Sequence, residues 1–111
     1  MAAWDVHLTE AAERDFQSIL AWTAEQFGQA QARRYRESLV SALAVLADGP
    51  DPLNWKSRED LALGLRSLHV GRRARHILFF RAGGEDVVEV LRILHEAMDP
   101  TRHFPSQEGG D

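Results

Sequence analysis

The chain contains no cysteine, which excludes disulfide bonds and thiolate metal sites. It also lacks any apolar run near the roughly 18 residues of a membrane-spanning helix. The N-terminus, Met1-Ala-Ala-Trp-Asp5, has no basic segment followed by a long apolar stretch, so we expect no signal peptide. The 111 residues leave room for one hydrophobic core. We therefore expect one domain over residues 1–105, a tail over residues 106–111, a cytoplasmic location and no membrane partner.

Lysine is almost absent as well: Lys56 is the only one, and the other basic residues are arginines. The formal net charge is −4, yet six of the thirteen Lys and Arg residues fall between Arg66 and His95, against three acidic residues. Arginine carries a planar donor fork that suits phosphate and carboxylate groups. This local basic cluster favours a surface for something anionic or for an acidic protein segment.

The N-terminal half shows one strand pattern and two helix patterns. Residues 4–8 alternate apolar and polar side chains, as in a half-buried strand. Thr9 stands where an N-cap belongs, and apolar residues then recur at helical spacing over residues 10–27, before Gly28. A second amphipathic pattern covers residues 29–47 and stops at Asp48-Gly49-Pro50. The short link predicts an antiparallel helix hairpin lying on a sheet.

The C-terminal half predicts strands. Residues 48–64 have the least regular pattern and are expected to form a loop. Three apolar runs, at about 65–70, 74–82 and 86–94, are joined by turn-like links and predict an antiparallel meander. An N-terminal strand, a helix hairpin and a three-stranded meander together predict a two-layer α+β domain.

Several motifs stand out along the chain. They are Leu8-Thr9-Glu10-Ala11-Ala12-Glu13-Arg14-Asp15, Arg66-Ser-Leu-His-Val-Gly-Arg72, Arg75-His-Ile-Leu-Phe-Phe-Arg81, and Val90-Leu-Arg-Ile-Leu-His95 followed by Met98-Asp99-Pro100 and Arg102-His103-Phe104. With these motifs the chain resembles the ParE/RelE superfamily of type II toxin–antitoxin toxins, and most of all its ParE branch. The resemblance covers residues 4 to about 104.

This resemblance implies a toxin neutralised by a cognate antitoxin, ParD-like or other, in a hetero-oligomer. ParE-branch toxins are understood to poison DNA gyrase, which favours a protein inhibitor over an enzyme. RelE-branch toxins instead cut mRNA in the ribosomal A site, so a ribosome-dependent endoribonuclease is the alternative. A domesticated, non-toxic family member is a third possibility. Because the branches share a fold, fold does not separate them.

RNA cleavage needs a base, an acid and cations around the phosphate. The ribonuclease candidates here are Arg75, Arg92, His95 and His103. The RelE branch is similar in strand layout, but there a basic cluster combines with a tyrosine near the C-terminus. The only tyrosine here is Tyr35, on a helix face that is expected to be core. A regular strand would also put Arg92 and His95 on opposite faces, unless it ends or bulges at Leu94.

The gyrase hypothesis uses the same basic cluster as a binding surface, with target-binding candidates Arg72, Arg73, Arg75, Arg92 and His95. Structural roles remain open for the same side chains. Arg92 can pair with a carboxylate such as Asp99 or Glu89, His95 can cap the strand end, and His76 can be a half-buried histidine with a partner. Arg72 and Arg73 can be ordinary solvated charges in a turn.

Antitoxin binding is expected where apolar surface exceeds the needs of one core. One helix hairpin covers one sheet face only, so we expect an amphipathic antitoxin helix, with or without an added strand, on the other face. The candidates for this contact are Trp4, Trp22, Arg66, Val87, Leu91 and Ile93. The histidines are scattered, so we expect no metal site and no cofactor.

Overall fold

The computed structural model describes residues 3–71 and 75–104. Its elements follow in the order β1 (Asp5–Leu8), α1 (Glu10–Phe27), α2 (Gln29–Val45), the 3₁₀ turn η1 (Leu46–Asp48), β2 (Lys56–Ser57), β3 (Arg66–His69), β4 (His76–Ala82), β5 (Val87–His95) and the 3₁₀ turn η2 (Pro100–Arg102). The predicted α+β class is confirmed. The predicted tail and the turn residues Arg72 and Arg73 lie outside the described residues.

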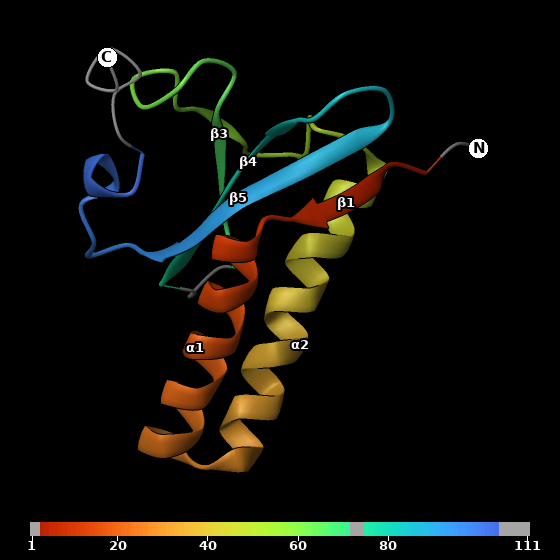
Figure 1. Cartoon of the computed structure of the whole chain (residues 1–111). Coiled ribbons are helices and arrows are strands. Elements are labelled where there is room, and N and C mark those ends of the chain that lie inside the picture. The colour runs from red at the N-terminus through yellow and green to blue at the C-terminus, as the bar shows by residue number, and fades with distance from the viewer. Residues whose placement is uncertain (1–2, 72–74, 105–111) are drawn as a thin grey trace.

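The five strands form one mixed sheet in the order β1-β5-β4-β3-β2. Strands β3, β4 and β5 make the predicted antiparallel meander, while β1 joins the sheet as a parallel neighbour of β5. The short edge strand β2 lies in the segment 48–64, for which the sequence predicts a loop and no strand. The two helices lie side by side and extend away from the sheet, so that their connection points away from it (Figure 1).

The helix boundaries follow from local chemistry. Thr9 is the N-cap of α1, and its hydroxyl accepts a hydrogen bond from the Ala12 N–H at 3.1 Å. Gly28 separates the helices with φ at 92°, a left-handed value that suits glycine, and its N–H bonds to the Ala24 carbonyl. Helix α2 ends at Val45, slightly earlier than predicted, because the chain tightens into η1.

Two apolar clusters lie on the two faces of the sheet. Alternation along β4 sends Leu78 and Phe80 toward the helices and Phe79 to the other face. The main cluster under the helices contains Ala12, Leu39, Ala42, Leu46, Val70, Leu78, Phe80, Val88, Val90 and Ile93. The second cluster contains Leu65, Phe79 and Leu94, with Leu61, Ala62, Ile77, Leu91 and Phe104 packed around them. The chain therefore covers part of the second face itself, and the expectation that only a partner covers it is wrong there.

A β-bulge interrupts β5 beside its pairing with β4. Phe79 pairs with Arg92 while Phe80 pairs with Val90, so Leu91 is the extra residue. The bulge shifts the alternation by one position, which returns Ile93 to the main cluster at 2% exposure. The expectation that Ile93 shares an outer face with Val87 and Leu91 is therefore wrong. The bulge lies at Leu91 and not at Leu94, and β5 continues to His95.

Candidate functional site

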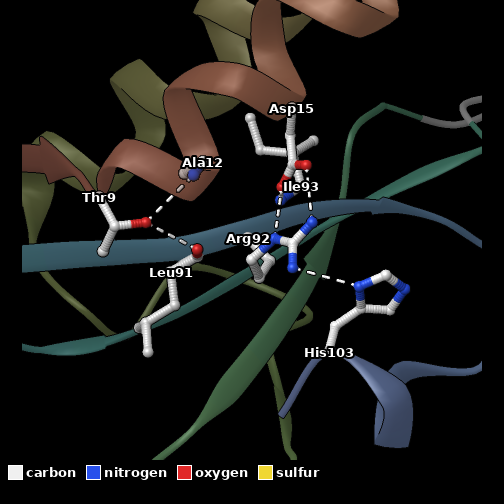
Figure 2. A network of polar contacts seen from close by, with 7 residues as sticks. All are labelled: Thr9, Ala12, Asp15, Leu91, Arg92, Ile93 and His103. Atoms are coloured by element: carbon white, nitrogen blue, oxygen red, sulfur yellow. Dashed lines mark hydrogen bonds and ion pairs between the residues drawn. The ribbon is translucent and has the colours of Figure 1, made fainter.

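An ion pair between α1 and β5 lies beside the bulge and forms a network of hydrogen bonds (Figure 2). Arg92 donates from Nε and Nη2 to the two carboxylate oxygens of Asp15, both at 2.8 Å. The side chains of Arg92 and Asp15 are only 23% and 15% exposed. The hydrogen bonds to Asp15 raise the pKa of the Arg92 guanidinium. The guanidinium is thus permanently charged and largely occupied by its own carboxylate.

The same helix terminus completes the hydrogen bonding of the bulged edge. The Thr9 N–H donates to the Val90 carbonyl at 3.0 Å, and the Thr9 hydroxyl donates to the Leu91 carbonyl at 2.8 Å. The Asp15 carboxylate also accepts the Ile93 N–H at 2.9 Å. Thr9, the N-cap of α1, and Asp15 of α1 therefore continue the ladder where β1 has ended, which anchors the helix to the sheet.

Arg92 was expected to pair with Asp99 or Glu89 if it had a structural role. Its partner is Asp15, because Glu89 pairs with Arg81 at 3.1 Å and Asp99 accepts hydrogen bonds from Thr101. The Thr101 hydrogen bonds lower the pKa of Asp99. The sequence did carry a signal for a partly buried carboxylate at Asp15, since this residue directly precedes Phe16, which lies on the apolar face of α1. Sequence reasoning nevertheless missed it.

His103 reaches the remaining nitrogen of Arg92 from the C-terminal side. Its Nδ1 lies 3.1 Å from Arg92 Nη1 (Figure 2). A guanidinium only donates, so this Nδ1 must accept and therefore carries no proton in this contact. Arg92 and His103 are therefore in contact, and the Arg92 guanidinium also bonds to Asp15.

His95 belongs to a different group on the helix side of the sheet. The His95 ring stands perpendicular to the His76 ring at 5.2 Å between centroids, and His76 Nδ1 bonds to the Tyr35 hydroxyl of α2 at 2.5 Å. Burial, together with the neighbouring His95, lowers the pKa of His76 to about 4. Burial also raises the pKa of Tyr35. The interpretation of His76 as a half-buried histidine with a partner is confirmed.

His95 also caps the end of β5, as its structural interpretation predicts. Its Nδ1 accepts the Ala97 N–H at 3.0 Å. Ile93 and His95 alternate with Arg92 and Leu94 along the strand, so Arg92 and His95 point to opposite faces. Arg75, with a side chain 72% exposed, forms a long ion pair of 3.7 Å with Glu96. The four ribonuclease candidates are therefore divided between two faces.

The residues expected to contact the antitoxin do not form one surface. Trp4 packs against the main cluster, and its backbone N–H donates to the Ala47 carbonyl at 2.8 Å. Arg66 lies over the Trp55 ring at 4.2 Å and contacts Asp51 at 2.6 Å. Trp22 is 57% exposed and far along α1. Val87 and Leu91 are half-buried, so only part of each is accessible to a partner.

A groove between α2 and the β2–β3 edge is a feature that sequence reasoning missed. Its volume is about 1150 Å³. The lining residues include Val45, which is 44% exposed, and Leu53, which is 85% exposed. The apolar part of the lining comprises Ala42, Val45, Leu53, Trp55 and Leu68, and the charged or titratable part comprises Arg34, Glu37, Lys56 and His69. Because α2 and the β2–β3 edge are remote in sequence, no local pattern shows this groove.

Within residues 3–71 and 75–104, no group of three or more potential ligands is arranged to hold a metal ion. No helix of this described part is long and apolar enough to cross a membrane.

Comparison with known proteins shows the family of the chain. A family model described as ParE toxin of type II toxin-antitoxin system, parDE, matches residues 6–100. Toxin ParE of Escherichia coli is 34% identical over 92 residues, which are 83% of this chain and 84% of that protein. Toxin ParE1 of Mycobacterium tuberculosis is 31% identical over 97 residues, which are 87% of this chain and 94% of that protein.

Two solved structures share the fold. A chain of the chromosomal ParDE toxin–antitoxin system from P. aeruginosa aligns with a TM-score of 0.67 and 20% identity, over 86% of this chain and 98% of that one. A chain of the E. coli DinJ-YafQ toxin-antitoxin complex aligns with a TM-score of 0.56 and 16% identity, over 85% of this chain and 93% of that one.

Fold and family model together define a toxin of the type II toxin–antitoxin class. Within that class, the chain belongs to the ParE family, which confirms the resemblance to the ParE branch.

Proposed function

We propose that this ParE-type toxin inhibits DNA gyrase by binding it, and that a cognate antitoxin neutralises the toxin by direct contact. The observation that carries the choice of binding over RNA cleavage is the Asp15–Arg92 ion pair. A cleavage site needs cations that are available to the phosphate. Arg92 is instead held by two 2.8 Å hydrogen bonds to Asp15, on the sheet face opposite His95.

The remaining acid and base groups support the same conclusion. The Tyr35 hydroxyl is bonded to His76, and the His95 Nδ1 is bonded to the Ala97 N–H. Burial keeps His76 neutral near pH 7, because its pKa is lowered to about 4. These groups stabilise contacts between α2, β4 and β5. An inhibitor of gyrase would act in the cytoplasm, where replication takes place.

The test of the target measures supercoiling by purified DNA gyrase with increasing amounts of the toxin. We expect inhibition that disappears when the toxin is first mixed with its antitoxin. Transcripts on translating ribosomes, exposed to the same toxin preparation, should stay intact. Cleavage of those transcripts without inhibition of supercoiling would overturn the proposal in favour of the ribonuclease alternative, and His95→Gln would then be the first variant to examine.

The groove between α2 and the β2–β3 edge is the proposed contact for the antitoxin. Its apolar lining suits one face of an amphipathic segment, and acidic residues on that segment would meet Arg34 and Lys56. Strand β2 pairs with β3 only at Arg66 and Ser67, so β3 extends beyond its edge neighbour at Leu68 and His69. This part of the edge suits an added strand.

Two valines of α2 provide a matched test of the groove. Val45 lines it and is 44% exposed, whereas Val40 is 41% exposed on the same helix and does not line it. Val45→Asp should weaken antitoxin binding about tenfold or more, while Val40→Asp should leave it nearly unchanged. Equal effects of the two substitutions on the dissociation constant would place the antitoxin elsewhere.

A further inference from the structure

The connection between the two helices lies at the end of the hairpin farthest from the sheet (Figure 1). Two aromatic side chains in the C-terminal part of α1, near this connection, are exposed. Trp22 is 57% exposed and Phe27 is 66% exposed, and their rings meet edge to face at 5.8 Å between centroids. Among the described residues, both rings lie outside the groups that make or flank the two apolar clusters. We call this surface the hairpin tip; it comprises Trp22, Phe27, Ala30, Gln31, Arg33 and Arg34.

We propose that the hairpin tip is the surface through which the toxin docks onto its target protein, at an acidic patch that presents an apolar side chain. This inference rests on the proposed function, because it takes the toxin to act by binding another protein. It assigns a surface that shares Arg34 with the groove that we propose for the antitoxin but is otherwise different from it.

The hairpin tip has little side-chain capping. The N-cap of α2 is Gly28, which forms no side-chain cap hydrogen bond, and the first turn of α2 has no acidic residue. Helix α1 has no basic residue in its last turn. Charged and capping side chains are common devices that stabilise helix ends, and here the glycine alone serves that purpose. Exposed Trp and Phe beside such an end follow the pattern of residues kept for binding.

The shape of the tip offers both a projection and a recess. The Trp22–Phe27 pair projects from α1. Beside Phe27, a recess of about 330 Å³ is lined by Phe27, Ala30, Gln31 and Arg34. An aliphatic side chain of a partner fits this recess while the aromatic pair packs against the partner surface. Trp and Arg are the residue types that most often dominate protein interfaces.

Charge selects the partner. The charged residues over positions 22–37 are Glu25, Arg33, Arg34, Arg36 and Glu37, all of them exposed. Three arginines against two glutamates leave this segment with a net charge of +1, on a chain with a net charge of −4. The tip is therefore basic on an acidic protein, so an acidic protein surface is attracted to it while a second copy of this chain is repelled overall. Arg34 lines the groove as well as the recess, so a bulky partner in one site hinders the other.

The experiment compares Trp22→Ala and Phe27→Ala with Leu63→Ala, which removes an 80% exposed side chain away from the tip. Each purified variant is assayed for inhibition of DNA gyrase, antitoxin affinity, oligomeric state and thermal unfolding. We expect about a tenfold or larger loss of inhibition for both tip variants, with unchanged antitoxin affinity and folding. Leu63→Ala should behave as wild type. Arg33→Glu should weaken inhibition most at low salt.

The other possible results distinguish failure of the docking role of the tip from failure of gyrase as the target. Full gyrase inhibition by both tip variants would overturn the inference and leave the proposed function standing. Loss of antitoxin binding, or dissociation of a wild-type dimer by the tip variants, would assign the tip to the antitoxin or to a second copy. If wild-type toxin does not inhibit gyrase, the proposed target is wrong, and the role of the hairpin tip is then tested by growth arrest in induced cells. Growth arrest by both tip variants would overturn the docking role of the tip. Loss of growth arrest in both variants would support docking of the tip to another protein.

Discussion

The helix hairpin has two ends of opposite character. At the sheet end, Thr9 and Asp15 satisfy the backbone groups of a bulged strand, and Asp15 neutralises Arg92. At the other end, Trp22 and Phe27 remain in solvent. The comparison shows that polar groups in this molecule mostly serve to hold the fold, whereas exposed apolar groups are the better guide to what it binds. Basic residues alone are a poor guide here, since the Arg92 guanidinium is paired with Asp15.

The largest stability effect is expected at Asp15. Asp15→Ala removes both hydrogen bonds to Arg92 and the acceptor of the Ile93 N–H, and leaves a mostly buried guanidinium without its counter-charge. We expect a loss of about 3 kcal/mol in the free energy of unfolding. Urea denaturation measures it, with Glu13→Ala, an exposed neighbour on α1, as the control. A loss below about 1 kcal/mol would show that the ion pair does not anchor the helix.

Thr9→Ala tests the same end of the hairpin more gently. The substitution removes the cap of α1 and the hydrogen bond to the Leu91 carbonyl, so we expect a loss of about 1.5 kcal/mol in the same assay. Thr9→Ser keeps the hydroxyl and should recover most of that loss. If serine is no better than alanine, the hydroxyl contacts are not the cause.

His76 gives the second helix its own anchor and a dependence on pH. Its pKa is lowered to about 4 in the folded chain from an unfolded value near 6.5. The unfolded chain therefore binds more protons between these values, so the stabilising contribution is complete above pH 6.5 and is lost as pH falls toward 4. After allowance for partial exposure we expect about 1 kcal/mol. Denaturation midpoints from pH 4 to 7 should fall less steeply with acid in His76→Gln than in wild type; identical slopes would refute this.

The smallest effect on stability is expected at the tip. Trp22→Ala should change the free energy of unfolding by no more than about 0.5 kcal/mol, because the side chain is 57% exposed and outside both apolar clusters. Urea denaturation beside Asp15→Ala gives the direct contrast between the two ends. A loss comparable to that of Asp15→Ala would mean that the tip holds the fold together after all.

Local sequence patterns were sufficient for most of the elements. The apolar spacing of α1, the Thr9 cap and Gly28 lie within a few residues of what they determine, and the apolar runs of β3, β4 and β5 with their turn-like links identified the meander. Pairings remote in sequence could not be obtained that way. The parallel placement of β1 beside β5 depends on which sheet edge is open, and periodicity does not encode it.

The site was predicted less well for the same reason. The choice of Asp15 as the partner of Arg92, and the return of Ile93 to the core, both depend on the single extra residue at Leu91. Strand alternation read from sequence assumes that no such residue exists. The groove beside α2 depends on how far the hairpin extends over the sheet, which no local pattern records. The structural interpretation of His76 succeeded because its half-burial follows from alternation with apolar residues along the strand, although its partner Tyr35 is remote in sequence. The interpretation of His95 succeeded because its contact with the Ala97 N–H is local.

The parallel pairing of β1 with β5 has a consequence for synthesis. Asp5 pairs with Val87, and Thr9 bonds to Leu91, so the first strand finds its neighbour only in the last one. A chain emerging from the ribosome can form its helices early, but the sheet stays open until β5 has left the exit tunnel. Sheet closure therefore waits for the synthesis of β5, and a product truncated before β5 lacks the strand that joins β1 to β4.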